Sequence, residues 1–158
     1  METLNKIKEE LKEAMKNGWQ TKISTLRMLL AAVHNKEIEL MKKETGLTEE
    51  ETMEVIRSEV KKRRDAIEGF EKGSRPDLAE QEKEELKILE SYLPPEISDE
   101  ELLLEIKKAI RETGAASPAD FGKVMKLLSP LLKGKASGSR IAAAVKKELE
   151  LARGPASD

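Results

Sequence analysis

The stretch SYLPPEISDEE, residues 91–101, marks the place where this sequence passes from one helical domain to another. Pro94 and Pro95 cannot continue a helix, because proline has no amide hydrogen and its ring clashes with the preceding turn. Ser98, with Glu101 three residues later, has the pattern of a helix N-cap. The stretch therefore predicts the end of one helical domain, a short linker and the first helix of a second domain.

Before this boundary, apolar residues recur at the three- and four-residue spacing that is typical of amphipathic helices. The spacing predicts helices over about residues 3–16, 21–43 and 49–70, and a fourth from near Pro76 to the two prolines. The second helix has a wide apolar set that includes Ile38, Leu40 and Met41, so we expect it to be central in its domain. Gly46 ends this helix, and Thr48 with Glu51 has the spacing of a capping box for the next one.

Three shorter helices are predicted after the boundary. The first begins at the Ser98 cap and is closed by Gly114, which can adopt the left-handed conformation that terminates helices. Ser117 and Pro118 begin the second, which we expect to end or kink shortly before Pro130. A loop, LKGKASGS, follows, and Ser137 or Ser139 can cap a last helix that reaches about Ala152.

The composition agrees with this reading, because 38% of the residues are charged and only 3% are aromatic. We therefore predict an all-α protein with a four-helix N-terminal domain, a small three-helix C-terminal domain and a frayed tail. Their predicted bounds are residues 1–93, 96–152 and 153–158.

Several classes of protein are excluded by the same composition. The chain has no cysteine, so disulfides, thiolate catalysis and cysteine-based metal sites cannot occur. No apolar run approaches the roughly 20 residues of a membrane span, and the N-terminus METLNKIKEELKEAMKN lacks the apolar core of a signal peptide. We expect a cytoplasmic protein that does not enter membranes, with a processed precursor as the alternative.

The basic run KKRR, residues 61–64, has acidic residues at helical spacing on both sides. Pairs such as Glu59 with Arg63 and Arg64 with Glu68 are four residues apart and can neutralise each other on a solvated helix face. Arg63, however, lies on the apolar stripe of its helix, and a buried unpaired guanidinium is costly. Arg63 and Arg64 thus form a candidate secondary anion or ion-pair site, with a carboxylate from the acidic fourth helix as the expected partner of Arg63 and a bound phosphate as the alternative.

A second basic run has no acidic residue at all between Phe121 and Lys147. Its cations surround a glycine-containing loop and the start of the last helix, where free amides and the helix dipole favour anions. Lysines beside free amides are suited to a phosphate backbone. The residues that we assign to this RNA-binding site are Lys123, Lys126, Lys133, Gly134, Lys135, Ser137, Gly138, Arg140 and Lys146, with Lys147 completing the run.

The alternative is that the acidic helix after the boundary, with Glu100, Glu101 and Glu105, folds back and neutralises these cations. If the site does bind nucleic acid, single strands are poor candidates, because stacking needs aromatic residues and this half of the chain has only Phe121. Recognition of shape and backbone, as in structured RNA, is the expected mode.

Three stretches of the chain resemble the GatB/YqeY family, and YqeY proteins in particular. They are STLRMLLAAVHNKEIE (24–39), KKRRDAIEGFEKGSRPDLAEQEKEELKILESYLP (61–94) and GKVMKLLSPLLKGKASG (122–138). The resemblance implies an all-helical fold with a four-helix and a three-helix domain. It also implies that the C-terminal half is similar to the tail of the B subunit of the tRNA-dependent amidotransferase, a tail associated with tRNA. The chain departs from the family at Ser137, where aspartate is usual.

The family label suggests a carbon–nitrogen ligase that uses glutamine as amido donor, but the residues give no support for catalysis. Amide hydrolysis needs an activated nucleophile, and His34 is the only histidine. We expect no catalytic residue, no cofactor and no metal. The predicted function is a non-catalytic module that binds tRNA or another structured RNA or associates with the tRNA-dependent amidotransferase; the alternatives are a protein-interaction adaptor and an auxiliary of amidotransferase activity.

Overall fold

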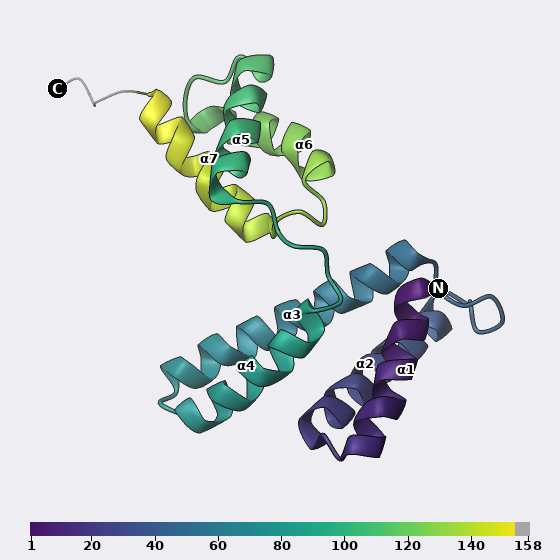
Figure 1. Ribbon diagram of the computed structural model, residues 1–158. Helices are drawn as coiled ribbons and strands as arrows, with labels where there is room; N and C mark the ends of the chain where they lie inside the picture. The colour runs from purple at the N-terminus through teal and green to yellow at the C-terminus, as the bar shows by residue number, and fades with distance from the viewer. Residues whose placement is uncertain (154–158) are drawn as a thin grey trace. The chain divides into compact units, whose positions relative to one another are not determined.

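The computed structural model of the protein describes residues 1–153, and within this range it is helical, with no strand (Figure 1). The all-α fold predicted from the sequence is confirmed. The last five residues of the predicted tail lie outside the described residues. The elements are α1 (Glu2–Asn17), α2 (Gln20–Glu39), α3 (Glu49–Lys72), α4 (Pro76–Glu90), α5 (Asp99–Thr113), the short 3-10 helix η1 (Pro118–Asp120), α6 (Phe121–Leu131) and α7 (Gly138–Ala152).

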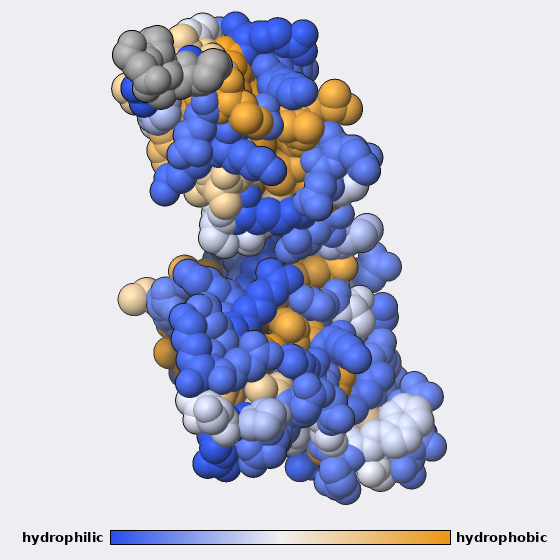
Figure 2. Space-filling model, turned by 90° about the vertical axis from the view of Figure 1, so that its left-hand side faces the viewer, coloured by the Kyte–Doolittle hydropathy of each residue, from blue (hydrophilic) through white to orange (hydrophobic). Residues whose placement is uncertain are grey.

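The chain divides into two compact units, one from Met1 to Leu93 and one that begins at Pro94. Each unit has an apolar core of its own. The core of the first unit contains Ile7, Leu26, Leu29, Ile56 and Leu89, and that of the second contains Ile106, Val124, Leu128, Val145 and Leu149. In the view of Figure 2, most of the surface is hydrophilic, with smaller apolar areas exposed on both units. None of the described helices is both long and apolar enough to span a membrane.

Helix α2 ends at Glu39, four residues earlier than predicted. The chain turns at Met41, which has a left-handed backbone with φ 56° and a side chain that is 94% exposed. Leu40 and Ile38 are exposed as well, so this part of the predicted apolar face does not reach the core. The early turn lets the chain reverse before α3, which begins with the predicted capping box between Thr48 and Glu51.

Of the two outcomes predicted for this helix, an end or a kink before Pro130, the end is wrong, because α6 includes Pro130 in its last turn and continues to Leu131. A proline this close to the end removes only one helical hydrogen bond. The amide of Leu132, just beyond the helix, is satisfied, because it donates to the carbonyl of Leu128 at 2.9 Å.

Among the described residues, three of the four cations of the basic run 61–64 have carboxylate partners, but not those expected from the spacing of four residues. Glu59 accepts from Lys62 at 2.7 Å instead of from Arg63, and Glu68 accepts from Lys72 at 2.6 Å instead of from Arg64. Arg64 reaches across to Glu90 of α4 at 2.8 Å. Glu59 and Glu68 thus pair with other lysines of α3, and Arg64 pairs with a carboxylate of α4.

Arg63 is held between two carboxylates of α4. Its Nε lies 2.9 Å from Oε2 of Glu85 and 3.3 Å from Oε2 of Glu82, and its side chain is only 11% exposed. Its Nη2 contacts the thioether sulfur of Met28 at 3.6 Å. The Nε of Arg63 and Oε2 of Glu82 are buried without an aligned hydrogen bond among the described residues, so the charges rather than the bond geometry hold this group.

The end of the first unit is fastened to α1 by Tyr92. Its buried hydroxyl donates to Glu10 Oε2 at 2.7 Å, and Lys22 Nζ lies 2.9 Å from the same oxygen. Burial raises the pKa of the Glu10 carboxyl, but the bonds from Tyr92 and Lys22 outweigh it, so the pKa is lowered overall. Burial and the Glu10 carboxylate raise the pKa of the Tyr92 phenol, which stays a hydrogen-bond donor.

Replacing Arg63 with alanine should lower the free energy of unfolding by about 3 kcal/mol, because Glu82 and Glu85 would remain buried without a cation. The matched control is Arg64→Ala, which removes a guanidinium from an exposed pair and should cost less than about 1 kcal/mol. Denaturant unfolding followed by circular dichroism measures both. Equal losses for the two variants would show that the Arg63 group does not stabilise the unit.

Replacing Glu10 with glutamine should destabilise the protein at neutral pH, and this deficit should shrink in acid. The pKa of Glu10 is lower in the folded than in the unfolded protein. The Glu10 carboxylate therefore stabilises the fold above the unfolded pKa of about 4.3, and this stabilisation is lost as the pH falls through the folded pKa. Melting temperatures at pH 7 and pH 3 test this, with Glu13→Gln on the same helix as control. A gap between wild type and Glu10→Gln that stays constant with pH would contradict the assignment.

Candidate nucleic-acid interface

The start of α7 is built by a serine cap and a glycine turn. Ser137 has an extended backbone, and its Oγ accepts from the amide of Arg140 at 3.2 Å. Gly134 has φ 80°, the left-handed region that glycine adopts most easily, and it turns the loop toward the helix. A Cβ added to Gly138 would meet no atom within 4 Å, so the first turn of α7 faces open space.

Arg140, however, already has carboxylate partners. Its Nη1 lies 3.2 Å from Glu96 Oε2 and its Nη2 lies 2.6 Å from Asp99 Oδ1. The hydrogen bond to Asp99 raises the pKa of the guanidinium above its usual value. Arg140 therefore joins the start of α7 to the start of α5 and is not available to a ligand without competition.

The linker takes part in the same contact. The amide of Ile97 donates to the carbonyl of Lys135 at 2.7 Å, so the chain before α5 lies against the loop before α7. Figure 1 shows the start of α5 and the α6–α7 loop at the same end of this unit. The sequence left open the alternative that acidic residues after the boundary neutralise the basic run. Carboxylates from this part of the chain do contact Arg140, but they are Glu96 and Asp99. Glu100, Glu101 and Glu105 make no ion pair with any described residue.

The lysines of the run fall into two groups by partner. Lys123 lies 3.7 Å from Asp120, and Lys133 also has an interaction partner. Among residues 1–153, no carboxylate lies within ion-pair distance of four exposed lysines, which are Lys126, Lys135, Lys146 and Lys147. These four retain the uncompensated charge that the sequence assigned to the whole run.

The structure brings some of the predicted site residues together and separates others. Lys135, Ser137, Gly138 and Arg140 lie at the entrance to α7. Lys146 lies two turns further along α7, where its ammonium is 5.6 Å from the ring centre of Phe121 at the start of α6. Lys123 and Lys126 are on α6 itself. The cations thus occupy two regions of the unit rather than one cluster.

Glu96 and Asp99 are the site residues that the sequence reasoning missed. Asp99 follows the Ser98 cap and belongs to an acidic first turn, which the helix dipole favours wherever the helix lies. Only the three-dimensional position of α7 shows that these two carboxylates face Arg140.

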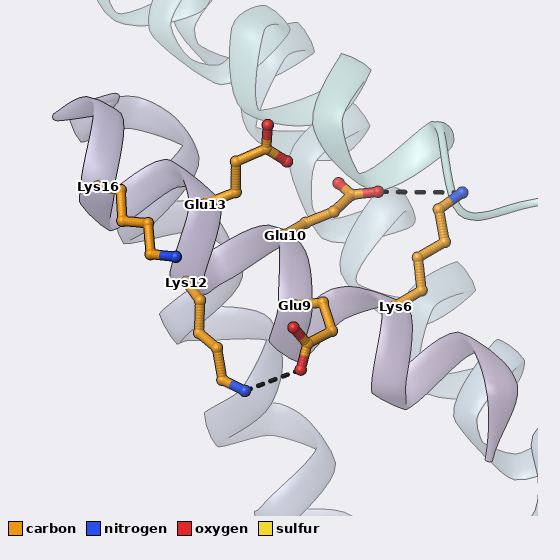
Figure 3. A pocket seen from close by; sticks show the side chains of 6 residues that line it. All are labelled: Lys6, Glu9, Glu10, Lys12, Glu13 and Lys16. Atoms are coloured by element: carbon orange, nitrogen blue, oxygen red, sulfur yellow. Dashed lines mark hydrogen bonds and ion pairs between the residues drawn. The ribbon is translucent and has the colours of Figure 1, made fainter.

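In the first unit, neither the surface of α1 nor His34 forms a group of side chains arranged for catalysis or metal binding. A shallow depression of about 320 Å³ on α1 is lined by Lys6, Glu9, Glu10, Lys12, Glu13 and Lys16. Figure 3 shows that these side chains come from one helix face, with Lys12 paired to Glu9 and Lys6 to Glu10. His34 is 63% exposed and lies 3.4 Å from Glu37. Within the described residues, no three acidic or histidine side chains are grouped so that they could hold a metal.

Comparison with known proteins gives the family of the chain. Residues 4–149 match the family described as Yqey-like protein. Two relatives are called altered inheritance of mitochondria protein 41, mitochondrial. The one from Eremothecium gossypii is 35% identical over 103 residues, which are 64% of this chain and 55% of the relative. The one from Lachancea thermotolerans is 30% identical over 121 residues, 75% of this chain and 64% of the relative.

An uncharacterized protein of Schizosaccharomyces pombe is 34% identical over 95 residues, which are 59% of this chain and 73% of that protein. The chain spans less than two thirds of the length of the two proteins named for mitochondria. The prediction of a cytoplasmic location is contradicted by this comparison, because the names of those relatives place them in mitochondria.

The serine at the start of α7 should act as a helix cap in solution. Replacing Ser137 with alanine removes the acceptor for the Arg140 amide and should lower the unfolding free energy by about 1 kcal/mol. Ser137→Asp keeps an acceptor and should leave stability close to that of the wild type. Ser139→Ala, two residues away, is the control. A loss for Ser139→Ala as large as that for Ser137→Ala would rule out the capping role.

Proposed function

The chain belongs to the Yqey-like protein family, and we propose that it is a non-catalytic module that binds tRNA or a similarly structured RNA through phosphate contacts of its second unit. The observation that carries this proposal is the set of four exposed lysines without a carboxylate partner among residues 1–153. Each can release a counterion from a polyphosphate when it binds.

The charge distribution supports the choice of the second unit. Its described residues contain eleven Lys and Arg against nine Asp and Glu, whereas residues 1–93 contain eighteen against twenty-one. Several acidic residues of the second unit are gathered near the start of α5, and the stretch 121–147 carries none. A polyanion that approaches this stretch meets four lysines that have no carboxylate within ion-pair distance in the described part of the chain, while Glu96 and Asp99 face Arg140 at the start of α7.

The chemistry of the surface favours a folded RNA over a single strand. The second unit has one aromatic residue, Phe121, and its ring is half-buried beneath Lys146. It cannot form a platform for successive bases. The N-terminus of α7 at Gly138, where an added Cβ would meet no atom within 4 Å, adds a place where a phosphate can approach backbone amides other than that of Arg140, which Ser137 already caps. Such contacts recognise the shape and backbone of RNA and carry little information about its sequence.

The absence of catalysis is part of the proposal. His34, the only histidine, contacts Glu37 on its own helix. A protein that binds tRNA without changing it is consistent with this, and so is an auxiliary role beside the tRNA-dependent amidotransferase. A mitochondrial location, which the relatives' names give for those proteins, is compatible with the function because mitochondria contain their own tRNAs.

The test is the salt dependence of tRNA binding, measured by fluorescence anisotropy across a series of salt concentrations. Replacing Lys126, Lys135, Lys146 and Lys147 together with alanine should weaken binding. It should also reduce the slope of log K against log salt by roughly 0.7–0.9 for each phosphate that the variant no longer neutralises. Arg140 is left intact, because its removal would leave Glu96 and Asp99 without their cation.

The matched control replaces four paired lysines of the first unit, Lys6, Lys12, Lys72 and Lys83, and changes the net charge equally. Its slope should equal that of the wild type. Equal slopes in all three proteins would overturn the assignment of the surface. Recovery of a protein partner after nuclease treatment, without tRNA binding in vitro, would favour a protein-interaction adaptor instead.

A further inference from the structure

Helices α2 and α3 of the first unit form the walls of a groove of about 650 Å³ that is open to solvent. Its lining runs from Met28 to Glu39 on α2 and from Glu54 to Lys62 on α3. The distance from Met28 to Glu39 corresponds to about 16 Å of helix, or three turns. The groove is therefore long enough to hold a short helix along its axis.

The lining is better suited to a helix than to a small molecule. Five of the eleven lining residues are charged and none is aromatic, whereas ligand pockets are predominantly apolar and aromatic. Ala31, Ala32 and Ser58 are small, so a helix backbone can approach closely. Met28, at one end, has 48% of its surface exposed and is free to cover an incoming apolar side chain.

We propose that this groove is the contact surface between two copies of this chain, with α2 of each copy lying antiparallel in the groove of the other. Met28, Ala32, Asn35 and Glu39 follow a spacing of four, three and four residues, and all line the groove. They form one stripe along α2. The same stripe can serve as the wall of one groove and as the occupant of the other, as a two-fold symmetric interface requires.

The charges of the groove select the antiparallel direction. Helices α2 and α3 run in opposite directions, since Met28 contacts Arg63 at one end while Lys42, just beyond α2, pairs with Glu51 at the other. One end of the groove therefore carries Lys62, and the opposite end carries Glu39 and Glu54. An antiparallel second α2 brings its Glu39 to the Lys62 end, whereas a parallel one brings Glu39 against Glu54.

The present contacts of these two charges leave room for a new partner. Glu39 pairs with Lys36 at 2.8 Å on the same helix, and its side chain is 66% exposed, so this pair is weak and Glu39 can leave it at little cost. Lys62 pairs with the buried Glu59 at 2.7 Å and keeps this partner, because a buried carboxylate without a cation is costly. The Lys62 side chain is 65% exposed, so it can contact Glu39 of the second copy in addition.

The first test blocks the groove. Ala31 is exposed and lines it, so Ala31→Arg fills the groove without removing any core contact. His34→Arg introduces the same residue on the same helix outside the groove lining and is the matched control. Sedimentation velocity over a range of concentrations should show a monomer–dimer equilibrium for the wild type and for His34→Arg, with dimerisation of Ala31→Arg weakened about tenfold or more. A wild type that stays monomeric at all concentrations would overturn the proposal.

The second test exchanges charges. Glu39→Lys alone and Lys62→Glu alone should each weaken the dimer, because each places like charges together twice in the symmetric interface. The double variant Glu39→Lys/Lys62→Glu should restore association toward the wild-type constant. Circular dichroism shows whether each variant is folded. If Lys62→Glu unfolds, Glu39→Lys alone tests the interface, because it leaves the buried Glu59 and its partner Lys62 unchanged. A double variant no better than the single ones would exclude this register.

Discussion

Pro94 and Pro95 interrupt the continuous hydrogen bonding of helices at one point in the chain, and the two apolar cores lie on either side of that point. An amphipathic helix can bury only one stripe, so each group of helices must complete a core from its own members. The first unit does so with four helices and the second with three short ones. Tyr92, buried two residues before the prolines and bonded to Glu10, keeps the end of the first core in place up to the interruption.

The environments of two arginines show the same electrostatic constraint in both units. Arg63 lies on an apolar stripe and could be predicted to need a carboxylate, because a guanidinium in a core is not stable alone. The structure supplies two, Glu82 and Glu85. Arg140 has no such signal in the sequence, since its neighbours along the chain are small and polar. Its partners, Glu96 and Asp99, are more than forty positions away and meet it only because the linker is bonded to the α6–α7 loop.

The sequence predicted the starts of three helices closely because they carry side-chain caps, Thr48, Ser98 and Ser137, which act locally. It failed where the deciding contact is not local or has no residue signature. Met41 has a left-handed backbone, which turn rules expect of glycine or asparagine and not of methionine. The turn at this residue nevertheless follows directly after the end of α2. Pro130 does not stop its helix before it, and the amide of Leu132 two residues later still finds a carbonyl in the preceding turn, which no rule for proline in sequences foresees. For the candidate interface, the residue types were foreseen, but the division between paired and unpaired cations depends on packing.

Among the described residues, the lysine surface of the second unit has unpaired cations and the groove of the first unit has paired ones, so the two surfaces differ in the interactions that they can make. At the RNA interface that we propose for the second unit, attraction between the unpaired lysines and a polyanion would act over distances set by ionic screening, so binding should depend strongly on salt. At the dimer contact that we propose for the first unit, Glu39 would leave an exposed pair and Lys62 would keep Glu59, so association should depend more on small side chains and helix register. If both proposals hold, two copies joined through their grooves would carry two lysine surfaces, each connected through its own Pro94–Pro95 linker. A single RNA that reached both would bind the second surface at a raised effective concentration, and modest contacts at each surface would then suffice for stable binding.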